Sequence, residues 1–374
     1  MPAPTKLDIL ELNFPSAGPA PAAQSSAAHS PHPVSKPFPF LAAAAALFLS
    51  PLVSAQTDRP EQARVRLAVG GKVGLFYLPV TIAERLGYFK DEGLDVEMID
   101  LASGAKALQA LVGGSADVTS GSYEHTIQMQ AKGMALTAFV LQGRLIDYSL
   151  GVVARKVPSY QSPKDLKGLK VAVSSPGAGT HMFLNAVLAK AGLKPEDVSV
   201  IGVGQTAGAV AAMRNGEIDA IANTDPVMTI LESAGDVRIV ADARTSDGSK
   251  LVYGGDYPAG SLYTTAEYLQ KNPRTVQALA NAMVRGLAWL QKATPQQVVE
   301  LLPPEFSAGE PEMLKQALGK LLPTYSRDGL FPDGGGERVL AAVATYDPEV
   351  RAAKIDVPKT YDNRFATEAA KKVK

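Results

Sequence analysis

The sequence has no cysteine in its 374 residues. This absence excludes disulfide bonds, thiolate zinc sites, iron–sulfur clusters, cysteine nucleophiles and a lipoprotein anchor on an N-terminal cysteine. Histidine is scarce too, because it occurs at four positions, of which His29 and His32 lie near the N-terminus. A histidine-rich metal site is therefore not expected, and we predict a protein that works without a metal or other cofactor.

The chain also lacks an excess of charge of either sign, because Lys+Arg and Asp+Glu both total 37. A neutral chain has no net field that would attract nucleic acid or an anionic lipid surface, so we predict no nucleic-acid partner. Hydrophobic residues make up 46% of the sequence, which is enough for ordinary cores. The length predicts two or more domains.

The N-terminal region reads as an export signal. Residues 1–35 are a low-complexity stretch rich in Pro, Ala and Ser. Residues 38–49 are an apolar run too short to span a bilayer, and the small residues Val53 and Ala55 suit a signal-peptidase site before Gln56. We predict that residues 1–55 are a leader and signal peptide and that the mature protein is periplasmic; the alternative is a buried hydrophobic helix.

Residues 1–33 are unusual in front of such a signal, which normally begins at its charged segment. We expect that they reflect a start codon assigned too early, with Val34 as the true initiator.

From residue 64 onward, strand and helix patterns alternate. Strands are predicted at 65–70, 95–100, 118–120 and 136–141, with helices at 80–86, 105–112 and 123–131. A second series predicts strands at 171–173, 198–203 and 220–222, with helices at 180–191 and 207–214. Alternation at this spacing predicts parallel βαβ units in two α/β lobes. Beyond residue 272 the pattern is helical, at 275–292, 296–302, 312–322 and 337–345.

Ligands of open α/β sheets lie beyond the carboxyl ends of the strands, so the loops there are the candidate site. The loop at residues 174–181 leads from a strand into a helix, and its free N–H groups would suit a sulfonate or carboxylate. Its glycines allow close backbone approach. Simple capping by Ser175 or Thr180 is the alternative. Met182 stands where a dinucleotide fingerprint needs a third glycine, so nucleotide binding is not predicted.

A second loop contains Ser120, Ser122, Glu124 and His125. A hydrolase triad is not predicted, because no GxSxG elbow is present and these residues share one helix start. Helix capping or a polar ligand contact explains them instead. Asp225 precedes a proline and is either a helix N-cap or the partner of an amino group.

Several segments resemble the periplasmic substrate-binding proteins of ABC importers, in the nitrate/taurine/alkanesulfonate group that also includes proteins similar to thiamine-pyrimidine synthases. The most specific is GYFKDEGLDVE at residues 87–97. The others are Leu78-Pro79 with Ile82-Ala83, Gly104-Ala105 with residues 113–118, residues 165–173 and residues 216–220. The resemblance runs from about Val65 to Tyr361.

This resemblance implies an α/β fold of the type II periplasmic-binding-protein class, with a ligand cleft between two lobes joined by two crossover strands, near residues 149–154 and 260–264. Lobe one would hold residues 64–148 plus 265–374, and lobe two residues 149–264. The protein would be a monomer that captures a small molecule and delivers it to an ABC permease and ATPase. The ligand contacts implied by position are Leu75, Phe76, Tyr77, Ser103, Ser120, Ser122, Tyr123, Glu124, Ser175, Gly177, Gly179, Thr180, His181, Gln205, Asn223 and Asp225.

Two questions stay open at the level of sequence. A sulfonate, taurine-like or other anionic ligand is favoured by the helix N-termini, whereas Glu124 and Asp225 would favour an amino-bearing pyrimidine or a zwitterion if they face the ligand. The protein is predicted not to be an enzyme, and the alternative is a pyrimidine-forming enzyme on the same fold.

Overall fold

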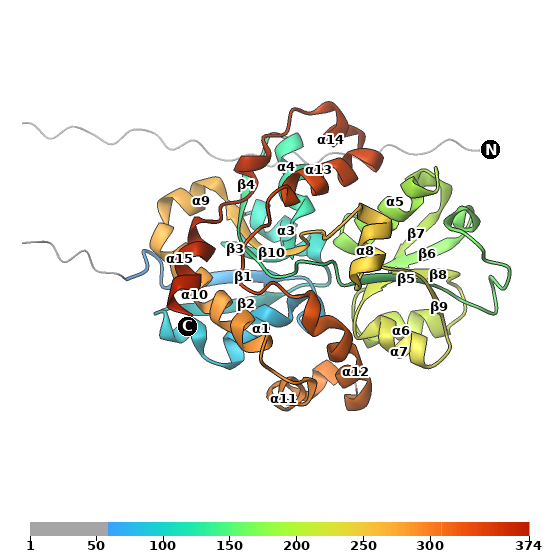
Figure 1. The fold of residues 1–374 in the computed structure, drawn as a ribbon, viewed down its shortest axis with the longest axis horizontal. Helices are drawn as coiled ribbons and strands as arrows, with labels where there is room; N and C mark the ends of the chain where they lie inside the picture. Colours follow the sequence, from blue (N-terminus) through green and yellow to red (C-terminus); the bar gives the residue numbers. More distant parts are fainter. Residues whose placement is uncertain (1–58, 308, 374) are drawn as a thin grey trace, which may run out of the picture. The chain divides into compact units, whose positions relative to one another are not determined.

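The computed structural model describes residues 59–373 with the exception of residue 308 (Figure 1). The predictions for residues 1–55, which concern the leader, the signal peptide and the start codon, lie outside the described residues. Among the described helices, none combines the length and the apolar character needed to cross a membrane.

The first sheet has five strands, in the order β2 (Asp95–Asp100), β1 (Arg64–Val69), β3 (Val118–Ser122), β10 (Gly260–Thr265) and β4 (Leu136–Leu141). Strands β2, β1 and β3 are parallel, with Leu67 aligned to both Met98 and Val118. Strand β10 runs antiparallel to both of its neighbours. A strand from far along the chain thus separates β3 from β4.

The second sheet also has five strands, in the order β7 (Ser199–Gly202), β6 (Lys170–Val173), β8 (Ala220–Thr224), β5 (Tyr148–Val152) and β9 (Arg238–Asp242). Strand β5 is antiparallel to β8 and β9, whereas β6 is parallel to β7 and β8. These strands form the green to yellow part of the ribbon in Figure 1.

The α/β class with two sheets is confirmed, and the two mixed sheets refine the prediction of parallel units. Strands β3 and β4 run in the same direction, as the parallel units predicted, but they are not neighbours because the antiparallel strand β10 lies between them. Strand β9 was not predicted at all. Periodicity along a chain reports the local element, but the order of strands depends on pairing between distant segments.

Helices flank both sheets. Around the first sheet they are α1 (Leu78–Arg85), α2 (Tyr88–Asp91), α3 (Gly104–Val112), α4 (Glu124–Ala131), α9 (Ala266–Lys271), α10 (Pro273–Leu290) and α15 (Arg364–Lys372). Around the second they are α5 (Gly179–Lys190), α6 (Ala207–Arg214), α7 (Val227–Ser233) and α8 (Ser246–Tyr253). The remaining helices are α11 (Pro295–Leu301), α12 (Pro311–Leu321), α13 (Gly335–Tyr346) and α14 (Pro348–Ala352), with short 3-10 turns between elements.

Helix α10 illustrates how the sequence specifies these helices. It begins at Pro273, which suits a first helical position, and buries an apolar stripe that includes Val276, Leu279, Met283 and Leu287. This stripe packs against α1 and α15.

Two C-terminal helices contact elements of the second sheet's layer. Helix α13 packs against both α4 and α5, and α12 packs against α7. The main hydrophobic cluster accordingly includes Leu67 and Phe139 from the first sheet and Val171 from the second. A smaller cluster with Met213, Met228 and Leu231 lies around α6 and α7.

Candidate functional site

The loops that follow strands of the two sheets touch each other directly. Ser122, at the end of β3, shares a hydrogen bond of 3.3 Å with the Tyr148 hydroxyl at the start of β5. The Ser175 hydroxyl, in the loop after β6, donates to Ser103 Oγ at 2.7 Å. Ser103 in turn caps the N-terminus of α3. Predicted contact residues from both sheets therefore meet at one junction.

Gly179, the first residue of α5, faces Ser122 and Tyr148 without room for a side chain. A Cβ at this position would lie 2.2 Å from Ser122 Oγ and 2.4 Å from the Tyr148 hydroxyl. The glycine is thus required by the contact between the two sheets' loops. The N–H groups of Gly179 and Thr180 have no hydrogen-bond acceptor among the described residues. They remain free to bind an anionic group.

Glu124 begins α4 and is almost fully buried, with 1% of its surface exposed. Neither carboxylate oxygen has a hydrogen-bond partner in the described residues. Burial raises the pKa of Glu124 to about 7, although the nearby hydroxyls of Ser122 and Tyr257 act to lower it. A buried carboxylate without a partner is costly, so Glu124 is a candidate for a ligand contact.

Tyrosines surround this carboxylate. Tyr253 and Tyr257 stack with their ring centroids 3.7 Å apart. Burial first, and then the charge of Glu124, raises the pKa of both phenols and of Tyr346. All three hydroxyls therefore stay protonated near neutral pH, and the Tyr253 hydroxyl is buried without a partner of its own. The groups near Glu124 thus include protonated phenols, and among the described residues no cation acts to lower its pKa.

His125 ties α4 to the loop before α5. Burial lowers its pKa to about 4, so the ring is neutral at pH 7. Because a carbonyl only accepts, Nε2–H must donate to Gly177 O at 3.2 Å, which leaves Nδ1 to accept from the Tyr263 hydroxyl at 3.0 Å. A neutral histidine in this position joins the two sheets and is not poised to take up a proton at pH 7.

The predicted segment 75–77 forms a 3-10 turn, η1 (Leu75–Tyr77), at the same junction. Phe76 stacks on Tyr148 at a centroid distance of 5.6 Å. The Leu75 N–H donates to the Asp225 carbonyl at 3.0 Å. Phe76 and Tyr77 are buried, with 5% and 2% of their surfaces exposed.

Asp225 forms hydrogen bonds and an ion pair within the protein. Its Oδ1 accepts from the Thr229 N–H at 2.8 Å in α7, and its Oδ2 accepts from Arg244 Nη1 at 3.0 Å. Arg244 and Asp225 are both almost fully buried. Of the two roles predicted for Asp225, helix capping matches these bonds, and both carboxylate oxygens already have partners.

Other predicted contact residues also bond within the protein. Tyr123 points into a cluster with Phe331 and Tyr361, and its hydroxyl bonds to Thr360. The remaining pairs are Ser120 with Gln142, Thr180 with Ser174, His181 with the Gly177 N–H, Gln205 with the Gly70 carbonyl, and Asn223 with the Gly204 carbonyl.

Three residues of the junction were missed from the sequence, namely Tyr148, Tyr253 and Tyr257. Single tyrosines in or beside helices and strands usually belong to the core, and nothing local marks these as different. Tyr253 and Tyr257 lie in the segment that joins β9 to β10, so their position depends on how that segment folds, whereas Tyr148 begins β5.

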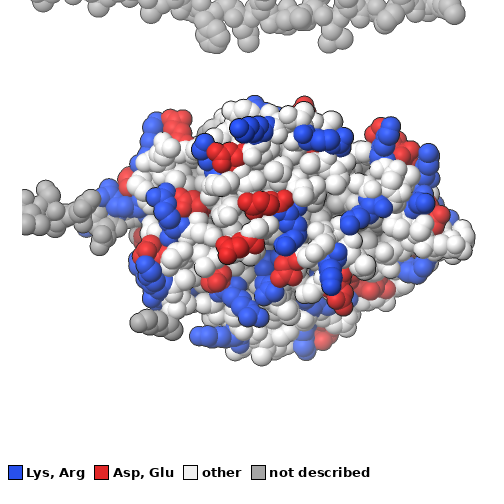
Figure 2. Space-filling model, turned by 45° about the horizontal axis from the view of Figure 1, so that its top comes forward, with Lys and Arg blue, Asp and Glu red and all other residues white. Residues whose placement is uncertain are grey.

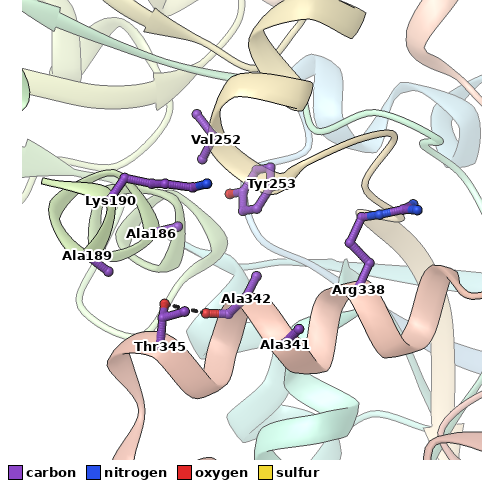
Figure 3. A pocket seen from close by; sticks show the side chains of 9 residues that line it. All are labelled: Ala186, Ala189, Lys190, Val252, Tyr253, Arg338, Ala341, Ala342 and Thr345. Atoms are coloured by element: carbon purple, nitrogen blue, oxygen red, sulfur yellow. Dashed lines mark hydrogen bonds between the residues drawn. The ribbon is translucent and has the colours of Figure 1, made fainter. Parts of the chain in front are cut away.

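A groove of about 340 Å³ opens between α5, α8 and α13 (Figure 3). Tyr253 is part of its wall, and Lys190 and Arg338 lie at its sides. On the face drawn in Figure 2, basic and acidic side chains are interspersed, as the neutral net charge predicts. In the described part of the chain, no cluster of three or more His, Asp or Glu side chains could hold a metal ion.

Solved structures with a similar fold identify the architecture of this chain. A structure from Bordetella bronchiseptica RB50 is 48% identical, with a TM-score of 0.82, and covers 84% of this chain and 99% of its own. The alkanesulfonate-binding protein SsuA from Xanthomonas axonopodis pv. citri, bound to MOPS, is 19% identical over 81% of this chain and 99% of its own, with a TM-score of 0.65. The fold is that of the periplasmic binding proteins, as the resemblance implied.

Curated relatives agree with this assignment. The putative binding protein YtlA of Bacillus subtilis is 24% identical over 260 residues, which are 69% of this chain and 76% of YtlA. The 4-amino-5-hydroxymethyl-2-methylpyrimidine phosphate synthase of Schizosaccharomyces pombe is 27% identical over 145 residues, 38% of this chain and 40% of that enzyme. The model of the NMT1/THI5-like family matches residues 77–297. The chain belongs to the NMT1/THI5-like family.

Proposed function

We propose that the protein is the substrate-binding component of an ABC importer and captures one small polar organic molecule at the junction of its two sheets. The observation that carries this proposal is Glu124, a buried carboxylate with both oxygens unpartnered beside loops from both sheets. A ligand that donates hydrogen bonds would remove the cost of that burial. The family and the fold support the same role.

The capture step is proposed to be a closure of two lobes, residues 64–148 plus 265–374 and residues 149–264. The bonds Ser175–Ser103 and His125–Gly177 join residues of one lobe to residues of the other. They would break on opening and re-form over a ligand. The mature protein is proposed to act as a monomer in the periplasm, where its partners are a permease and an ATPase.

The ligand is proposed to be a taurine-like zwitterion. The free N–H groups of Gly179 and Thr180 favour an anionic end. Glu124 disfavours a simple anion, such as nitrate or an alkanesulfonate without an amine, because a second negative charge would lie near a desolvated carboxyl. An amino group on the same ligand resolves this conflict by donating to Glu124.

A thermal-shift screen of the mature chain tests the role and the ligand together. The probes are taurine, ethanesulfonate, nitrate, MOPS and 4-amino-5-hydroxymethyl-2-methylpyrimidine, each at millimolar concentration. A ligand that binds only the folded state raises the melting temperature. We expect a shift with taurine or MOPS and none with nitrate or ethanesulfonate. A shift with ethanesulfonate equal to that with taurine would contradict the zwitterion.

The second candidate function is pyrimidine chemistry, which the relationship to the pyrimidine phosphate synthases favours. In that case Glu124 would accept from the exocyclic amino group of a pyrimidine. A shift with the pyrimidine alone would support this ligand. Mass spectrometry of the incubated mixture then distinguishes binding, which leaves the pyrimidine unchanged, from enzymatic conversion.

A further inference from the structure

One side chain links the groove between α5, α8 and α13 to the surroundings of Glu124. Tyr253 is the last residue of α8 and lines the groove, yet 8% of its surface is exposed and its hydroxyl is buried without a partner. In Figure 3 the ring of Tyr253 projects over Ala342 of α13.

The ring of Tyr253 is connected to the carboxylate through Tyr257. Tyr253 stacks on Tyr257 at 3.7 Å, and Tyr257 carries a hydroxyl close to Glu124. The charge of Glu124 acts on both phenols. A stacked pair of tyrosine rings therefore lies between a groove of about 340 Å³ and a desolvated carboxylate.

Tyr253 lies at the end of its helix. Gly254 caps α8 with a φ of +82° in the left-handed region, and Gly255 follows it. The walls of the groove come from elements on both sides of the proposed closure, since α5 and α8 flank the second sheet whereas α13 also packs on α4. Opening of the lobes would widen the groove.

We propose that this groove is the route by which small molecules reach the buried Glu124 carboxylate and that Tyr253 is its gate. Lys190 and Arg338 at the sides of the groove, with no acidic residue in its lining, favour an incoming molecule with an anionic group. The identity of the occupant rests on the proposed function, but the route is a property of the free protein and can be measured without a ligand.

The test is the rate at which a water-soluble carbodiimide with methylamine labels Glu124 at pH 6, read from the peptide by mass spectrometry. Tyr253→Ala removes the gate and should raise this rate at least tenfold. Tyr253→Phe keeps the ring and should leave it within twofold of the wild-type rate. Ala342→Phe, which adds a ring to the groove, should lower it at least threefold, both alone and together with Tyr253→Ala.

Two controls make the result specific. Ala288→Phe adds a ring to a different groove, beside Tyr88 and Trp289, and should leave the labelling of Glu124 unchanged. Asp225 is fully buried elsewhere and reports loosening of the fold. An unchanged Glu124 rate in Tyr253→Ala would overturn the proposal. If Asp225 also reacts faster in Tyr253→Ala, that variant has loosened the fold, and the result with Ala342→Phe is used instead. An unchanged rate of Glu124 labelling in Ala342→Phe would then overturn the proposal.

Discussion

Glu124 occupies the first turn of a helix, where an acidic side chain is favourable and usually faces water. The sequence therefore gives no sign that this particular carboxylate is desolvated. The charge of Glu124 acts on Tyr253, Tyr257 and Tyr346, which lie more than a hundred residues away along the chain. Glu124 could be named as a candidate ligand contact from the sequence, but the rise of its pKa could not be predicted.

The pKa of Glu124 predicts how stability changes with pH. Between pH 4.5, the ordinary value, and about 7, the folded protein keeps a proton that the unfolded chain has lost. The free energy of unfolding should therefore fall as the pH rises through this window, by about 3 kcal/mol for the full shift. Glu124→Gln removes this decline, so urea unfolding at pH 5 and pH 8 should show a smaller loss in the variant.

Two other buried groups also titrate, so the comparison must be made between the variant and the wild type. Asp147 has a pKa raised to about 7 by burial and adds a decline of the same sign. The lowered pKa of His125 gives the opposite trend between about pH 4 and 6.5. Both effects are present in the two proteins and cancel in the difference. Equal losses from pH 5 to pH 8 would show that Glu124 is not desolvated.

A second prediction concerns the buried ion pair of Asp225 and Arg244. Arg244→Met would leave the Asp225 carboxylate buried without its cation and should lower the free energy of unfolding by about 3–5 kcal/mol. The matched control is Arg214→Met, whose pair with Asp236 is solvent-exposed and should cost less than about 1 kcal/mol. Similar losses in the two variants would refute a structural role for Asp225.

At the scale of elements, most strands and helices could be predicted from the sequence to within a few residues. Each has its own pattern of apolar residues and a residue, often glycine, that ends it. Strands β2 and β4 and helix α6 have the predicted bounds. What could not be predicted is the pairing of β10 between β3 and β4, and the fold of residues 226–259, where short elements give weak periodicity. The unpredicted α8 carries Tyr253, so the gate was missed with it.

The loop before α5 was predicted to approach an anion through its glycines, but Gly179 is already required by its contact with Ser122 and Tyr148. Gly179→Ala should therefore prevent the closed arrangement and lower ligand affinity at least tenfold, while each lobe stays folded. Calorimetric titration with the ligand from the screen and a thermal melt measure the two effects. Gly208→Ala in α6, whose new methyl group would have 3.6 Å to its nearest neighbour, is the control. Wild-type affinity in Gly179→Ala would contradict the account of this contact.

At the scale of the whole molecule, residues of the two sheets meet through few polar bonds and many buried aromatic rings. Phe76, Tyr148 and Phe183 form a continuous series of ring contacts across the junction. In the proposed closure, apolar contact at the junction would favour the closed arrangement, whereas the unpartnered Glu124 would oppose it until a donor binds. A ligand that donates to this carboxylate would therefore shift the balance toward the closed arrangement.

The central claim, that Glu124 is the ligand's partner, is tested most directly by calorimetric titration of the wild type and Glu124→Gln at pH 8 with the compound identified in the screen. Glu97→Gln, which changes an exposed carboxylate of β2 paired with Arg64, is the matched control. We predict that Glu124→Gln lowers the affinity at least tenfold, consistent with one charge-assisted hydrogen bond of about 1.5–3 kcal/mol, while Glu97→Gln binds as the wild type does. Affinity within twofold of the wild type in Glu124→Gln would contradict the account.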